Sequence, residues 1–154
     1  MLSSQKINRI SIALRDFEGA LKYASKASEY EMSTVEYEAL LFAAIVSYWR
    51  PFSPNELHEN GSAISAIKLA DFERFSELEL KLHENCKLLR NKVLAHSEYA
   101  FNPTKLDEQT GTFIGRRLSV TSCNFQVSVL TTLLNKLIEQ CHNYRANYAR
   151  VSTK

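Results

Sequence analysis

The stretch YEALLFAAIVSYW, residues 37–49, constrains the fold more than any other feature of the chain. A helix built from it carries apolar side chains nearly all round, and such a helix is normally buried at the centre of a helical bundle. We predict that the helix begins at Ser33, with Glu36 three residues later completing a capping box. It should end before Pro51, because the residue before a proline avoids the helical conformation.

Two amphipathic segments are predicted to pack against this central helix. Apolar residues follow one another at intervals of three and four over residues 7–24, and Ser3 or Ser4 can cap that helix. A similar stripe predicts a last helix over about residues 124–148. Both stripes are narrow, so each of these helices should expose its opposite face to solvent.

A third long helix is predicted to begin at Asp71 and to end between His96 and Tyr99. Its stripe is interrupted near Asn85 and Cys86, and it consists of Phe75, Leu78, Leu82, Leu89 and Val93. Before this helix, residues 51–62 read as a loop and residues 63–70 as a short helical turn. Three amphipathic helices around one apolar helix make a bundle the natural architecture.

The helical pattern is broken at residues 100–121. Turn signals occur there, and Phe113–Ile114 and residues 118–120 flank Gly115, which indicates a small β-hairpin. Elsewhere Gly (4) and Pro (3) are scarce, so long uninterrupted segments are expected. We therefore predict an all-α, up-down four-to-five-helix bundle with a small β-hairpin around 100–121, as a single domain spanning 1–154.

Charge and cysteine content narrow the functional classes. The net charge is only +2, and residues 101–154 carry seven bases against three acids. This basic end is compatible with a phosphate-bearing partner, but so small an asymmetry favours an ordinary solvated surface. Three cysteines at irregular spacing indicate a reducing compartment. Since no apolar run approaches the roughly 20 residues of a membrane span and the N-terminus has no signal core, we expect a cytoplasmic protein without a membrane partner.

The segment RNKVLAH, residues 90–96, holds the candidate catalytic groups. An Arg followed by a His at this distance arises easily by chance in a chain with nine Arg and four His. The position is more informative, because His96 lies three residues after Val93 and continues the predicted apolar stripe. On an α-helix Arg90 points about a third of a turn away from His96. The competing interpretation is that His96 merely interacts with the carbonyls at a helix C-terminus.

The sequence CKLLRNKVLAHSEYA resembles the signature helix of HEPN domains, which are helical bundles common in prokaryotic toxin–antitoxin and phage-defence systems. The family motif is an Arg, a polar residue and, after four to six positions, a His, which correspond here to Arg90, Asn91 and His96. The resemblance implies metal-independent RNA cleavage at a homodimer interface, with no cofactor and with a cognate antitoxin as a possible partner. Arg90 would hold the phosphate, His96 would transfer protons and Asn91 would assist.

Other polar groups are weaker candidates. Lys87 and Lys92 on the same predicted helix, and Arg50 at the end of the apolar helix, are expected to contact the substrate. His83 and Cys86 lack the further ligands of a zinc site, so we interpret them as an exposed His and a core Cys. The alternative function is a non-catalytic bundle that binds a nucleotide, nucleic acid or a partner protein.

Overall fold

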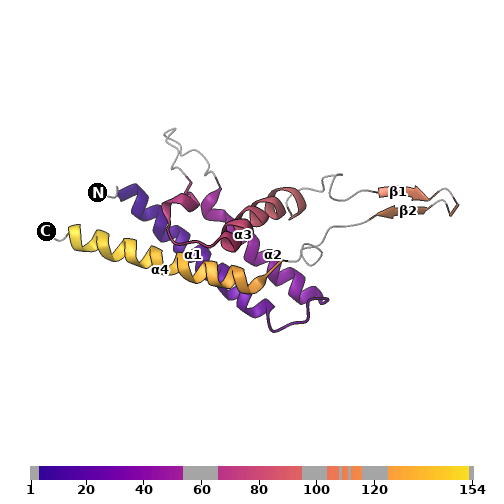
Figure 1. Cartoon of the computed structure of the whole chain (residues 1–154), viewed down its shortest axis with the longest axis horizontal. Helices are drawn as coiled ribbons and strands as arrows, with labels where there is room; N and C mark the ends of the chain where they lie inside the picture. Colours follow the sequence, from indigo (N-terminus) through magenta and orange to yellow (C-terminus); the bar gives the residue numbers. More distant parts are fainter. Residues whose placement is uncertain are drawn as a thin grey trace.

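The computed structural model describes residues 4–53, 66–94, 104–107, 109–110, 112–115 and 125–152. The α-helices in this part of the chain are α1 (Ser4–Ala27), α2 (Val35–Trp49), α3 (Glu77–Leu88) and α4 (Val127–Ser152) (Figure 1). Shorter elements are the 3₁₀ turns η1 (Arg50–Phe52) and η2 (Leu69–Asp71), the π-helical segment η3 (Leu89–Leu94), and the strands β1 (Thr104–Asp107) and β2 (Thr112–Gly115). The predicted all-α bundle with a small hairpin is confirmed.

Helix α1 is central to the bundle, because it packs against both α2 and α4 (Figure 1). The predicted stripes of the first and last helices are confirmed, and the side chains with no exposed surface include Phe17, Leu130, Leu133, Leu134, Leu137 and Cys141. On α2 the buried face carries Leu41, Ile45 and Tyr48. The opposite face of α2 stays in solvent, so the prediction that this helix is buried all round is wrong.

The ends of α2 follow from local chemistry. The cap is Thr34 rather than the predicted Ser33, since the Thr34 hydroxyl accepts a hydrogen bond from the Tyr37 amide. The helix ends before Pro51, as predicted, and the chain continues as the 3₁₀ turn η1. The buried Arg9 side chain of α1 donates to the carbonyls of Pro51 and Ser53 at 3.1 and 3.4 Å, which joins the start of α1 to the end of α2.

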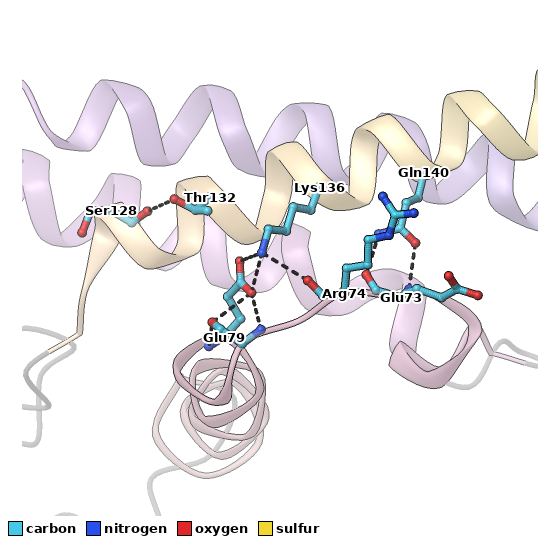
Figure 2. Close-up of polar contacts among 8 residues, drawn as sticks. Glu73, Arg74, Glu79, Ser128, Thr132, Lys136 and Gln140 are labelled. Atoms are coloured by element: carbon cyan, nitrogen blue, oxygen red, sulfur yellow. Dashed lines mark hydrogen bonds and ion pairs between the residues drawn. The ribbon is translucent and has the colours of Figure 1, made fainter.

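Helix α3 differs from its prediction in start and in orientation. It begins at Glu77, not at Asp71, because Ser76 and Glu79 form a capping box in which each side chain accepts from the other residue's amide. The buried face includes Glu79, Leu82, Cys86 and Leu89, whereas Leu78 of the predicted stripe is 62% exposed. Figure 2 views α3 nearly along its axis while α4 runs across the picture, so α3 lies crosswise on α4 and departs from the up-down arrangement.

A buried ion pair joins α3 to the middle of α4. Lys136 Nζ lies 2.8 Å from the carboxylate oxygens of Glu79, and it also donates to the Arg74 carbonyl at 3.2 Å (Figure 2). Burial alone raises the pKa of Glu79, but hydrogen bonds from Lys136 and Ser76 outweigh it, and the pKa lies below the ordinary value. Glu79 is therefore ionised at neutral pH with its charge neutralised by Lys136.

The hairpin pairs different strands from those predicted. Strand β2 contains Phe113 and Ile114 as expected, but its antiparallel partner is β1, in which Leu106 faces Phe113 and Lys105 faces Ile114. The predicted partner at 118–120 lies outside the described residues. Of the predicted turn at 63–70, residues 66–70 are described, and only Leu69 and Ala70 are helical, as the first two residues of η2. None of the described helices is both long and apolar enough to cross a membrane.

We predict that Lys136→Met lowers the free energy of unfolding by about 2–3 kcal/mol at pH 7, because it leaves the Glu79 carboxylate buried without its cation. The loss should shrink as the pH falls below the ordinary Glu value, since the variant then protonates Glu79 and the wild type gives up the contribution of its lowered pKa. Urea denaturation at pH 7 and pH 3 measures both. An equal loss at the two pH values would contradict this account.

Candidate functional site

The candidate residues lie where α3 passes into η3. The chain is α-helical to Leu88 and then forms six residues of π-helix, Leu89–Leu94, in which each amide bonds five residues back. This changes the sequence-based geometry, because the relation between Arg90 and His96 was derived for 3.6 residues per turn. That angle does not apply to a segment with wider turns. Long π-helical segments are rare, and such irregularities occur frequently at functional sites.

Arg90 and Asn91 form a pair within η3. Arg90 Nη1 donates to Asn91 Oδ1 at 3.0 Å, and both side chains are half-buried. Among the described residues no carboxylate pairs with Arg90, so its other N–H groups and the Asn91 amide N–H₂ remain as donors. The pair therefore presents hydrogen-bond donors and one positive charge, which suits a phosphate oxygen.

The other predicted site residues are not all brought together. His96 lies outside the described residues, and Lys92 is described only by its backbone in η3. Lys87 is exposed, with its Nζ 3.9 Å from Glu84 on the same helix. Arg50 pairs with Asp16 of α1 at 3.6 Å, and none of its described contacts reaches Arg90. The structure thus places Arg90 in contact with Asn91, and their association with His96 stays a prediction.

Sequence reasoning missed an aromatic cluster around His83. Its ring centroid lies 4.8 Å from those of Trp49 and Phe52, and its Nδ1 lies 2.7 Å from the Tyr48 hydroxyl. The prediction that His83 is exposed is wrong, because α2 and η1 cover one side of the ring. Trp49 packs within this cluster, and only 7% of its surface is exposed.

The Tyr48 hydroxyl and the burial of the ring both favour a neutral His83. Tyr48 is fully buried, and burial raises the pKa of its hydroxyl, so the O–H must donate to an acceptor. The only acceptor within reach among the described residues is His83 Nδ1, which leaves the ring hydrogen on Nε2. Burial also lowers the pKa of His83, although Glu84 acts in the opposite direction. The imidazole is therefore neutral at pH 7.

The described cysteines are structural. Cys86 and Cys141 are fully buried and reduced. Burial raises the pKa of Cys141 to about 12 and raises that of Cys86 as well, so neither forms the thiolate that a nucleophile needs. The interpretation of Cys86 as a core residue is confirmed, and Cys141 is buried as well. Within the described segments no three His, Cys, Asp or Glu side chains are grouped closely enough to bind a metal ion.

No protein-family model matches the chain, and neither a curated protein nor a solved structure matches it. The arguments about function therefore come from the site itself. They depend on Arg90 and Asn91 in η3, with His83 seven residues before Arg90 in the preceding helix α3.

We predict that the wild type loses stability relative to His83→Gln as the pH falls. The folded protein holds His83 with a lowered pKa, so below the ordinary value of 6.5 the unfolded chain binds more protons than the folded one. The Gln amide oxygen accepts from Tyr48 and does not titrate. Chemical denaturation of both proteins between pH 8 and pH 5 measures the difference, and parallel curves over this range would contradict the assignment.

Proposed function

We propose that the protein is a metal-independent endoribonuclease of the HEPN type that acts as a toxin or phage-defence effector. The resemblance over residues 90–96 motivates this proposal, and the observation that carries it is the Arg90–Asn91 pair in η3. RNA supplies its own nucleophile, the 2′-hydroxyl, which attacks the adjacent phosphate. The protein then has to stabilise negative charge and transfer protons.

Each residue has a separate task in this reaction. Arg90 binds the phosphate oxygens, and Asn91 holds the guanidinium through the 3.0 Å hydrogen bond while its amide N–H₂ remains free to donate to the same phosphate. His96 moves the protons, because an imidazole titrates near neutral pH. Lys87 and Lys92 attract the flanking phosphates. One Arg and one His make a sparse site, so a second copy of the chain supplies a second set.

Exposed apolar side chains on α2 and at the end of α3 support a homodimer. Val35 is 78% exposed and Phe42 41% exposed on the open face of α2, and Leu88 next to η3 is 45% exposed. Ala39 lies between Val35 and Phe42 at helical spacing, which makes the face a continuous apolar stripe. Apolar stripes of this kind on a soluble chain mark interaction surfaces. In the proposed dimer two copies pair through this stripe, and the two Arg90–Asn91 sets face one cleft.

We expect the purified protein to cleave single-stranded RNA in buffer that contains a metal chelator. His96→Ala and Arg90→Ala should each reduce the rate constant by at least about 100-fold, because they remove the proton-transfer group and the oxyanion donor. Lys81→Ala is the matched control, since Lys81 is an exposed base on α3 that the proposal does not use. Gel-resolved cleavage of a labelled RNA measures all three.

Two outcomes would contradict the proposal. Undiminished cleavage by His96→Ala with the fold intact would remove that residue from the mechanism. Binding of RNA without any cleavage by the wild type would favour the alternative, a non-catalytic bundle. Inhibition by a co-expressed antitoxin would require activity in the first place, so it is tested only after cleavage is measured.

The dimer surface is tested separately. Phe42→Glu places a charge in the apolar stripe of α2 and should convert the dimer to a monomer, with a parallel loss of RNA cleavage. Val151→Glu introduces the same charge at an equally open site, 53% exposed on the far end of α4, and should change neither property (Figure 1). Sedimentation velocity gives the mass of each protein. A monomeric wild type that still cleaves RNA would refute the composite site.

A further inference from the structure

A groove on the outer side of α4 is not used by the proposed ribonuclease site. Its volume is about 420 Å³, and it lies between α4 and the segment Glu73–Arg74 that precedes α3. The α4 wall includes Gln140, Asn143 and Asn147. These three side chains follow at spacings of three and four, so they form one row of amides along the helix.

The first amide of this row already binds backbone. Gln140 Oε1 accepts from the Glu73 amide at 2.8 Å, and Gln140 Nε2 donates to the Glu73 carbonyl at 2.9 Å (Figure 2). In an antiparallel sheet, a residue on the neighbouring strand likewise pairs with both the N–H and the C=O of one residue. Gln140 therefore recognises the main chain of an extended residue, and it does so without reading the side chain.

The next two side chains of the row carry the same amide group. Asn143 and Asn147 are exposed, and neither has a hydrogen-bond partner in the described part of the chain. The chain itself does not follow the row toward them, because it turns into η2, where the Asp71 carbonyl accepts from the Tyr144 hydroxyl at 2.6 Å. Of the three amides in the row, only Gln140 therefore binds the main chain of this protein in its described part.

Arg74 adds a charge at the same place. Its φ is 67°, a left-handed conformation that side chains other than Gly adopt uncommonly, and Lys136 holds its carbonyl. Figure 2 shows the Arg74 side chain rising beside Gln140. No carboxylate among the described residues forms an ion pair with its guanidinium, which is therefore available to an acidic group.

The charge balance of the groove favours a peptide over a nucleic acid. Lys136 is already neutralised by Glu79, so Arg74 is the available cation of the lining. Glu73 and Glu139 place two carboxylates beside it. A phosphate backbone needs a surplus of positive charge, which this lining lacks. A peptide backbone offers one N–H donor and one C=O acceptor at most residues, and a peptide carries charge only on individual side chains.

We propose that this groove binds an extended peptide segment of a partner protein that carries an Asp or Glu side chain. Asn143 and Asn147 bind the peptide backbone in the manner of Gln140 and Glu73, and Arg74 pairs with the acidic side chain. The proposal does not depend on ribonuclease activity, because the groove residues and the Arg90–Asn91 pair are separate sets.

The test is selection of a phage-displayed library of random linear heptapeptides on the full chain, followed by titration of the enriched synthetic peptides. The enriched peptides should share an acidic residue at one position. Asn143→Ala/Asn147→Ala should weaken their binding about tenfold or more, as expected for lost hydrogen bonds. Asn135→Ala, an exposed amide of α4 outside the groove, is the matched control and should bind normally.

Arg74→Gly separates the charge from the backbone contacts. Gly adopts a positive φ freely, so the variant should keep its fold while losing the preference for an Asp peptide over its Asn analogue. The groove proposal fails if no peptide is enriched, or if the enriched peptides bind the double variant as tightly as the wild type. It fails equally if a 12-nucleotide RNA displaces them and loses affinity in the double variant. RNA cleavage, measured in parallel, should be unchanged in all these variants.

Discussion

The ion pair between Glu79 and Lys136 determines how the rest of the structure is arranged around α3. This helix is only 12 residues long, and its core contribution is small, with Leu82 and Cys86 as its buried apolar side chains. Helix α3 therefore lacks the long stripe that aligns α1 with α4. Separating the buried Glu79 carboxylate from its cation costs free energy, so the pair holds this face of α3 against α4.

The rotation of α3 decides which of its residues reach α2. His83 follows Glu79 by one turn of α3, so the two lie along one edge of the helix, and Arg90 follows seven residues after His83 in η3. With Glu79 held on α4, this edge runs toward the end of α2, where His83 enters the cluster of Tyr48, Trp49 and Phe52. Arg90 and Asn91 follow in η3, where the proposed ribonuclease chemistry is placed.

The candidate site was predictable only in part. Arg90 and Asn91 are adjacent in the sequence, so their hydrogen bond needs no tertiary contact and their joint role could be inferred from the segment alone. His83 was misjudged because its cover comes from α2 and η1, and no pattern within α3 reveals it. The groove on α4 was missed for the same reason, although the regular spacing of Gln140, Asn143 and Asn147 is a signal that a search for polar rows on helices could find.

The sequence by itself determined the helices and the buried faces of α1 and α4, because the spacing of apolar residues within one helix is a local property that matches the helical repeat. It also determined the end of α2 before Pro51, which is a matter of neighbouring residues. Only the tertiary structure decided the rotation of α3, the neutral state of His83 and the open face of α2. Glu79 and Lys136 are 57 residues apart and Tyr48 and His83 are 35 apart, so their contacts form only once the helices have packed.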